Sequence, residues 1–448
     1  MVSAARRALP PAALPLVAVQ LALLSVFDLA AHLWATLALL LGGFLALAWA
    51  LRRLRSPDAA RPLPILAVAA LLRLLAVPLP PTLSDDVWRY LWDGRLAAAG
   101  GNPYLVAPAS PATEPLRDGL WRRLPHRDVP TIYPPLALAA FSIASRLPAS
   151  PWALKTIIAG ADLAACALLV SLAGRLRLAP GRAVAYAWNP LVVLETAGMG
   201  HVDALGVLAV LATALALTAR PRRVALAAAA AAAGVLAKLL PAAALPLWAR
   251  LCGRPGRFAA VSLALVGLAF APVFVATGGL PPGWRIYAIS WEFNGPLFEP
   301  LWRLLDLAGV PAGTVRLLDQ LKLWTGEHGF WNRFYPYAYP QLLAKLLLGA
   351  AALVAVAASL RETRLVEANC RLFGRLLLLS ATVYPWYLLW VLPWAALAGG
   401  SAWLLVAALA PLAYLAQPGG VDPFPWLYLS IWGPPLVLSL WRRRWSTG

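Results

Sequence analysis

The chain has 448 residues, of which 61% are hydrophobic and only 13% are charged. Soluble globular domains carry roughly twice that share of charged residues, so the composition excludes an ordinary soluble enzyme and indicates a polytopic helical membrane protein. The formal charge of +19 does not indicate nucleic-acid binding, because the basic residues form short clusters between apolar runs rather than one patch.

These arginine clusters are typical of cytoplasmic loops, which are enriched in Lys and Arg in multi-pass membrane proteins. With both ends of the chain in the cytoplasm, about 14 crossings place every cluster inside, and we expect roughly 12 to 14. The clusters are Arg52, Arg53 and Arg55; Arg175, Arg177 and Arg182; Arg220, Arg222 and Arg223; Arg250, Arg254 and Arg257; Arg361 and Arg364; and Arg442, Arg443 and Arg444.

Most of the apolar runs are long enough to cross a bilayer as single helices, which takes ~20 residues. Two further runs, 224–249 and 372–399, are interrupted by polar residues or Pro, so each predicts two short helices that meet near the outer membrane face. The predicted single crossings are 10–27, 33–51, 63–81, 152–173, 183–199, 203–219, 258–277, 339–360, 401–417 and 424–441.

This topology leaves two long segments outside, both rich in Trp, Tyr and Pro and nearly balanced in charge. Residues 134–147 within the first segment are apolar but short for a crossing, and predict an interfacial helix. The predicted parts are N-terminal transmembrane helices (1–81), a first extracytoplasmic loop with interfacial helices (82–151), transmembrane helices (152–277), a second extracytoplasmic loop (278–338) and C-terminal transmembrane helices (339–448).

The stretch "TLSDDVWRYLWDGR" at 82–95 places several charges at the edge of a predicted membrane segment. Ser84 is a suitable cap for a helix that starts at Asp85. On that helix Asp86, Arg89, Tyr90 and Asp93 share one face. In a purely structural interpretation, the acidic residues of this helix only pair with its arginines. In the functional interpretation, one of its carboxylates lies at the water–lipid boundary and acts as a general base on a hydroxyl, and partial desolvation raises the pKa of that carboxylate.

Other polar and aromatic residues are predicted to reach the same outer face. Lys238 and Arg285 suit an anionic phosphate, and Trp291 and Trp386 suit a sugar ring. Structural alternatives remain open, because Lys238 is also able to snorkel and the aromatic residues also fit an interfacial belt. The other candidates here are His126, Tyr133, His201, Asp203, Asn294 and Tyr384.

The segments "SDDVWRYLWDGRLAAAGGNPY", "HRDVPTIYPPLA", "GHVDAL" and "YPWYLLWVLPW" resemble, in their order, the bacterial GT-C fold glycosyltransferases, in particular the polyprenol-phosphate-mannose-dependent mannosyltransferase-like group. The resemblance covers about residues 63 to 400. It implies an all-α, GT-C-type bundle of roughly 12–14 transmembrane helices with two long extracytoplasmic loops. It also implies a lipid-phosphate sugar donor, an extracytoplasmic active site, and inversion at the anomeric carbon with a loop aspartate as base.

Carried onto this chain, the resemblance makes Asp85 and Asp86 the base candidates without deciding between them. We favour Asp86, because it shares a helix face with Arg89 and Asp93. Lys238, Arg285 and His201 are then expected to hold the donor phosphate. The expected substrate-binding residues are Arg89, Tyr90, Asp93, His126, Tyr133, Asp203, Trp291, Asn294, Tyr384 and Trp386.

No cofactor and no obligatory metal are expected, because two adjacent carboxylates without further ligands make a poor metal site. The cysteines, Cys166, Cys252 and Cys370, have no CxxC spacing that would suggest zinc or a disulfide framework.

We therefore expect a multi-pass glycosyltransferase of the inner (cytoplasmic) membrane that moves a hexose, with mannose favoured, from polyprenyl phosphate to an extracytoplasmic glycan or lipid acceptor. The alternative is a transporter or flippase of a lipid-linked sugar, which predicts internal repeats and charges near mid-span. The enzyme is favoured because the polar groups gather on one face, with Arg73 the main exception.

Overall fold

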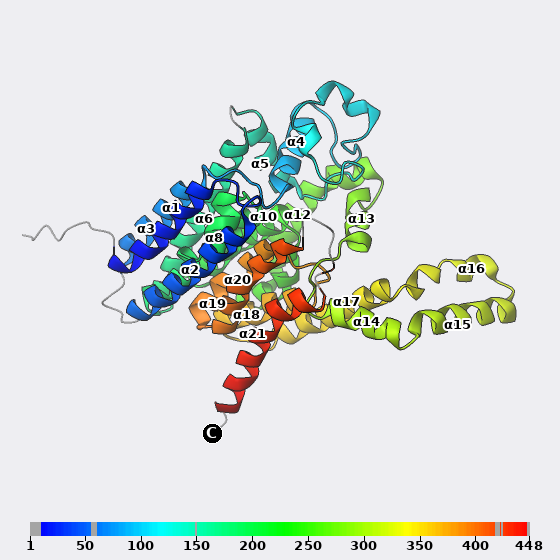
Figure 1. The fold of residues 1–448 in the computed structure, drawn as a ribbon. Coiled ribbons are helices and arrows are strands. Elements are labelled where there is room, and N and C mark those ends of the chain that lie inside the picture. Colours follow the sequence, from blue (N-terminus) through cyan, green and yellow to red (C-terminus); the bar gives the residue numbers. More distant parts are fainter. Residues whose placement is uncertain (1–9, 55–60, 148–149, 417–421, 423, 446–448) are drawn as a thin grey trace, which may run out of the picture.

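The computed structural model describes residues 10–54, 61–147, 150–416, 422 and 424–445. In these residues the chain forms a bundle of helices and no strand, apart from isolated β-bridges between 293–294 and Thr382. Figure 1 shows the N-terminal helices α1 (Leu14–Val26), α2 (Leu33–Arg53) and α3 (Pro62–Ala76) side by side on one flank of the bundle. The predicted all-α polytopic membrane protein is confirmed.

Among the described residues, four helices are long and apolar enough to cross a membrane: α2, α6 (Ser150–Arg175), α12 (Pro255–Thr277) and α17 (Pro340–Ser359). The helix pair Pro190–Gly198 and Asp203–Leu217 is bent by 118° at the break between its two parts. It is a fifth candidate if the two parts form one span. The other predicted crossings contain shorter apolar helices, so the count of about 14 stays a prediction.

Prolines explain why several helices are shorter than the apolar runs that contain them. Helix α3, for example, ends at Ala76 inside the predicted crossing 63–81, because Pro78, Pro80 and Pro81 cannot continue a helix.

The two runs that we expected to be interrupted are indeed divided. Helix α10 (Val224–Ala237) ends where Lys238 turns to an extended conformation, and η7 (Leu240–Ala244) and α11 (Leu245–Leu251) follow. The second run contains the end of α18 (Leu365–Leu378), then η9 (Pro385–Trp390) and α19 (Leu392–Ala398).

A buried ion pair joins the middle of the bundle and accounts for Arg73, the charge that did not fit the outer face. The Arg73 guanidinium lies 2.6 Å from Asp162 Oδ2, and Tyr186 and Thr196 donate to the same carboxylate at 2.7 and 2.8 Å. These contacts tie α3 to α6, α7 (Val184–Ala187) and the π-helical turn Leu194–Gly198. Arg73 is therefore part of a structural cross-link.

The first long segment begins with α4 (Asp86–Ala98) and closes with α5 (Pro135–Ser145), which confirms a short helix at 134–147. The two helices touch at Gly94, whose carbonyl accepts a hydrogen bond from Ser142 Oγ at 3.0 Å. Nearby, Tyr90 stacks on Phe141 with ring centroids 4.6 Å apart. Helix α4 is thus held rigidly on α5, and Asp86 stands at its first turn.

The second long segment forms α13 (Pro282–Ser290), α14 (Phe298–Leu307), α15 (Val310–Thr325), α16 (His328–Asn332) and η8 (Tyr335–Ala338). Figure 1 shows α15 and α16 in an arm that projects from the body, while α13 lies near α4. The remaining helices are α20 (Ser401–Leu409), η10 (Ala410–Leu415) and α21 (Trp426–Trp445).

Gly94→Ala is expected to destabilise the protein by about 1–3 kcal/mol, because overpacking forces backbone to move. A Cβ at Gly94 would lie 2.3 Å from the Phe141 carbonyl carbon. We expect a lower thermal midpoint by tryptophan fluorescence in detergent. Gly160→Ala on α6 is the control, because a Cβ there meets no atom within 4 Å. Equal midpoints for the two variants would contradict close packing of α4 on α5.

Candidate active site

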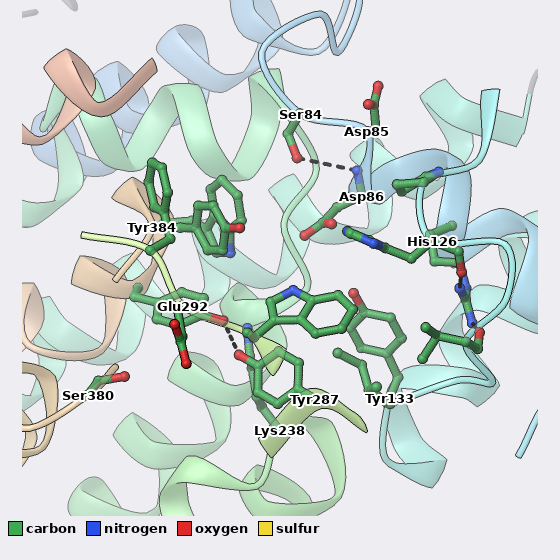
Figure 2. Close-up of a pocket in the computed structure, with 18 of the residues that line it drawn as sticks. Ser84, Asp85, Asp86, His126, Tyr133, Lys238, Tyr287, Glu292, Ser380 and Tyr384 are labelled. Carbon is green, nitrogen blue, oxygen red and sulfur yellow. Dashed lines mark hydrogen bonds between the residues drawn. The ribbon is translucent and has the colours of Figure 1, made fainter. Parts of the chain in front are cut away.

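A cavity of about 1050 Å³ opens where the first loop, the break after α10, helix α13 and the break before η9 meet. Figure 2 shows side chains from all four of these segments around it. Nine of the fifteen predicted site residues line the cavity: Asp85, Asp86, Arg89, His126, Tyr133, Lys238, Trp291, Tyr384 and Trp386.

Asp86 is the first residue of α4, one position later than predicted, and Asp85 rather than Ser84 occupies the N-cap position. Ser84 still contributes, because its Oγ accepts a hydrogen bond from the Asp86 N–H at 3.3 Å. Tyr90, one turn along, donates its hydroxyl to Asp86 Oδ2 at 3.1 Å. A carboxylate in the first turn of a helix also interacts favourably with the helix dipole.

The neighbouring carboxylate, Asp85, is oriented differently. Its side chain is exposed at the mouth of the cavity, and Figure 2 shows it directed away from the other labelled groups while Asp86 points among them. Desolvation by the surrounding protein and then the Asp86 charge raise the pKa of Asp85, against an opposing effect of His126. Asp86 is therefore the carboxylate directed into the cavity.

Arg89 shapes the cavity wall rather than presenting a free charge. It forms an ion pair with Asp93 at 2.9 Å and donates to the carbonyls of His126 and Val129 at 3.0 and 2.6 Å. The structural interpretation of the Arg89–Asp93 pair is therefore satisfied, and Asp93, 1% exposed, does not line the cavity. The pair fixes the loop that carries His126.

His126 packs its ring on Trp291 with centroids 4.5 Å apart. Desolvation and then the Arg89 charge lower the pKa of His126, although both nearby aspartates oppose this. A neutral imidazole is consequently favoured at pH 7, which suits hydrogen bonding to a sugar more than phosphate binding.

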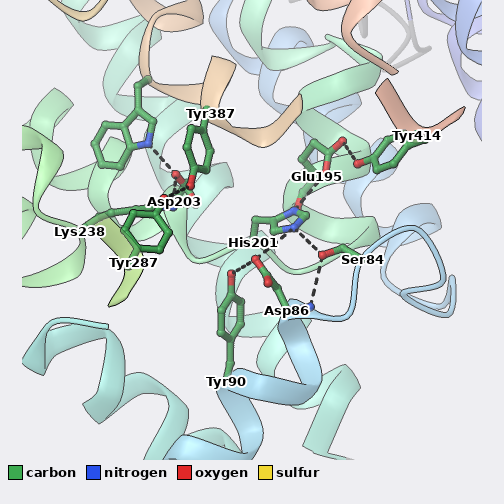
Figure 3. A network of polar contacts seen from close by, with 11 residues as sticks. Ser84, Asp86, Tyr90, Glu195, His201, Asp203, Lys238, Tyr287, Tyr387 and Tyr414 are labelled. Atoms are coloured by element: carbon green, nitrogen blue, oxygen red, sulfur yellow. Dashed lines mark hydrogen bonds and ion pairs between the residues drawn. The ribbon is translucent and has the colours of Figure 1, made fainter. Parts of the chain in front are cut away.

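His201 lies behind the cavity wall and is only 1% exposed. Its Nε2 is 3.2 Å from Ser84 Oγ and 3.9 Å from Asp86 Oδ2. On the other edge of the ring, Nδ1 lies 3.0 Å from Glu195 Oε2, and Tyr414 donates to Glu195 Oε1 at 2.6 Å. Figure 3 shows this network running from Tyr414 to Asp86.

Glu195 was missed by the sequence analysis. It is fully buried within the run 183–199, which we interpreted only as an apolar crossing. The available signal was the charge itself, because an ionisable residue inside a membrane segment is by default a candidate functional residue.

Lys238 lines the cavity and is paired with a buried carboxylate. Its Nζ lies 2.9 and 2.7 Å from the two oxygens of Asp203, and Trp390 Nε1 donates to Asp203 Oδ1 at 2.6 Å. Lys238 also sits 4.7 Å above the Tyr387 ring, whose hydroxyl contacts that of Tyr287 at 2.6 Å. Asp203 therefore holds Lys238 in place and is covered from the cavity.

Stacked aromatic rings form one wall. Trp386 lies between His201 and Tyr384, at centroid distances of 3.9 and 4.5 Å, and Tyr384 stacks on Phe293 at 4.6 Å. Such a wall offers apolar ring faces next to carboxylates, which suits a sugar with both polar edges and C–H faces.

The structure does not bring every predicted residue to the cavity. Arg285 is exposed on α13, and Asn294 is buried beneath Trp432, from which it accepts a hydrogen bond at 3.0 Å. Tyr90, Asp93, His201 and Asp203 support residues of the wall. Besides Glu195, the sequence analysis missed the cavity residues Trp284, Tyr287, Glu292, Ser380, Tyr387, Trp390 and Tyr414.

Within the described ranges, no three His, Cys, Asp or Glu side chains are grouped so that they could hold a metal ion. The expectation of metal-independent chemistry stays a prediction.

Comparison with protein families matches residues 1–254 to the model of the MptA_B family, described as alpha-(1->6)-mannopyranosyltransferase, N-terminal domain. The match covers more than half of the 448 residues and includes Asp86, His201 and Lys238. No curated protein and no solved structure matches the chain.

Lys238→Met is expected to destabilise the protein by about 1–3 kcal/mol, because it leaves the fully buried Asp203 with an uncompensated charge. Lys238→Met with Asp203→Asn removes both charges and keeps an acceptor for Trp390. The double variant should thus regain part of the lost thermal stability. If it is no more stable than Lys238→Met, the ion pair does not account for the loss.

Proposed function

The chain belongs to the MptA_B family of alpha-(1->6)-mannopyranosyltransferases, and on that premise we propose that it transfers mannose from a polyprenyl-phosphate donor to an acceptor outside the cytoplasmic membrane. The observation that carries the proposal is the Asp86 carboxylate, which lies within the matched segment and lines a cavity walled by aromatic rings. The acceptor class that we infer is a glycan or a lipid that carries one, in keeping with an α-(1→6) mannosyl linkage.

In the proposed reaction Asp86 is the general base. Both contacts of its carboxylate among the described residues fall on Oδ2, so Oδ1 is available to an acceptor hydroxyl. The acceptor oxygen attacks the anomeric carbon from the side opposite the phosphate while its proton passes to Asp86. The bond from the anomeric carbon to the phosphate oxygen breaks, and its electron pair leaves with polyprenyl phosphate. The configuration is inverted.

The leaving phosphate is already a stabilised anion, so the reaction needs a cation near it more than a general acid. Lys238 is the cation that we propose, because an ammonium has three N–H donors and only two are directed at Asp203. Its side chain is 24% exposed, which fits contact with a bound group. Arg285 does not enter this proposal, because it does not line the cavity.

The proposed orientation places the cavity on the extracytoplasmic side of the inner membrane. Asp203 at the start of α9 (Asp203–Leu217) and Lys238 after α10 lie at one end of this hairpin, and the cluster Arg220, Arg222 and Arg223 lies at the other. Helix α9 has 15 residues, so the two ends are about 22 Å apart. The positive-inside rule then supports a cytoplasmic arginine cluster and an outer cavity.

We also retain the division of the chain that follows from this orientation. Segments 82–151 and 278–338 act as the outer loops, and the first supplies the base while the second supplies Trp291. The parts 1–81, 152–277 and 339–448 form the membrane bundle beneath them.

Asp86→Asn is expected to lower the rate of transfer of radiolabelled mannose from polyprenyl-phosphate-mannose by at least about 100-fold, because the amide cannot accept the proton. The Asp85→Asn variant is the matched control, since its carboxylate is exposed and directed away from the other labelled groups of the cavity. It should retain activity within a few-fold. Transfer is measured in membranes that contain each variant and compared with transfer in membranes that contain the wild type. Size-exclusion chromatography checks that each variant is folded.

Two results would contradict the proposal in different ways. Loss of activity in Asp85→Asn with retention in Asp86→Asn would assign the base to the other carboxylate. Equal transfer by the wild type and both variants would exclude a catalytic role for this stretch.

The purified protein should use polyprenyl-phosphate-mannose and not a nucleotide sugar, and EDTA should leave the rate unchanged within about twofold. The reason is that the mechanism needs Asp86 and Lys238 but no metal. Transfer measured with each donor, with and without EDTA followed by Mg²⁺ or Mn²⁺, checks both points. A rate that falls with EDTA and returns with the ion would overturn the metal-independent mechanism.

A further inference from the structure

We propose that Glu195 is a positioning residue for this reaction, which orients His201 and through it Ser84 and Asp86. The proposal rests on the function proposed above, because it takes Asp86 as the base. Glu195 itself is too deeply buried to touch a substrate, and its effect is transmitted by the ring of His201.

The local backbone brings Glu195 to His201. Residues Leu194–Gly198 form a π-helical turn, a wide turn that often occurs at functional sites. Gly200 follows with φ +81°, a conformation that favours glycine, and the chain then doubles back so that the His201 N–H donates to the Glu195 carbonyl at 2.9 Å. The side chains of Glu195 and His201 consequently face each other across one tight turn.

The partners of His201 indicate which ring nitrogen carries the proton. Nδ1 lies 3.0 Å from Glu195 Oε2 and 3.1 Å from the Glu195 carbonyl, and both of these oxygens are acceptors. Nδ1 is therefore the protonated nitrogen. In the neutral ring Nε2 is then an acceptor, and it faces Ser84 Oγ.

The hydrogen bonds now run in one direction. The Asp86 N–H donates to Ser84 Oγ, the Ser84 hydroxyl donates to His201 Nε2, and Nδ1–H donates to the Glu195 carbonyl, with the charged Glu195 Oε2 only 3.0 Å from Nδ1. Ser84 precedes the N-cap of α4, so this chain fixes the start of the helix that carries the base. Aligned hydrogen bonds of this kind strengthen one another in a low-dielectric interior.

Two further contacts restrict the ring and the carboxylate. Trp386 covers one face of the His201 ring at 3.9 Å, nearly parallel to it. Tyr414 from η10 donates to Glu195 Oε1, which leaves Oε2 toward His201. Trp386 thus holds one face of the ring and Glu195 holds Nδ1, and Nε2 is the ring atom that contacts Ser84 and lies near Asp86.

An alternative is that Glu195 and His201 only satisfy each other as buried polar groups. The two interpretations differ in what Glu195→Gln does. An amide fills the same volume but carries no charge, so the part of the Nδ1–H preference that the carboxylate provides is lost, while the Glu195 carbonyl still accepts from Nδ1. An Nε2–H ring donates to Ser84 Oγ and competes with the Asp86 N–H. In hydrolases an equivalent carboxylate-to-amide change keeps the geometry and lowers kcat through the wrong tautomer.

The experiment combines kinetics with ¹⁵N NMR of histidine-labelled full-length protein in lipid, which is practical because the chain has only 4 histidines. A His201→Gln sample assigns the His201 signals. In the wild type, Nδ1 should be protonated and Nε2 unprotonated. In Glu195→Gln the Nε2–H form should gain population, and kcat for mannosyl transfer should fall by at least about tenfold with little change in KM.

Thr213→Val is the control, because it removes a buried hydroxyl of α9 that does not line the cavity, and it should lower kcat by less than about threefold. A Glu195→Gln protein with unchanged His201 signals would overturn the proposal, and so would an unchanged kcat. If the wild type transfers no mannose, the proposed function fails, while the NMR arm still decides whether Glu195 sets the tautomer of His201.

Discussion

Every buried carboxylate in this bundle has to be matched by a partner, and this constraint decides which polar groups remain for chemistry. An unpaired charge in apolar surroundings costs several kcal/mol or more. Asp162 is matched by Arg73, Glu195 by His201 and Tyr414, and Asp203 by Lys238 and Trp390. Asp86, 30% exposed and held by Tyr90, contrasts with these groups because it lines the cavity and, among the described residues, has no buried cation beside it.

The partners are able to meet because the helices are interrupted beside them. Lys238 follows the end of α10, His201 follows the π-helical turn, and Trp386 lies in a 3-10 helix. Irregular backbone at membrane depth is tolerated where protein or a water-filled cavity surrounds it. The interruptions therefore build the cavity, since each one brings a polar or aromatic side chain to the cavity itself or, for His201, to the layer directly behind its wall.

Features set by local sequence were predictable. Lys238 followed by Pro241 marked the break after α10, and the four-residue spacing on one helix correctly placed Tyr90 by Asp86 and Arg89 by Asp93. The pairing of Lys238 with Asp203 was not predictable, because it depends on how two antiparallel helices end at the same level. Asn294 illustrates the same limit, since its partner Trp432 is 138 residues away.

The two halves of the chain contribute to the cavity in different proportions. Both described cations that line it, Arg89 and Lys238, and the Asp86 carboxylate lie within the family-matched residues 1–254, whereas most of the aromatic rings lie beyond them, including Trp291, Tyr384 and Trp386. Charges fixed in one rigid framework suit the two proposed steps, which are deprotonation of the acceptor and departure of the phosphate. Ring faces select a bound group by its shape and are easily changed without disturbing buried ion pairs. On the proposed mechanism, the matched half therefore supplies the charges for the transfer, and the other half supplies most of the surface that a bound sugar would contact.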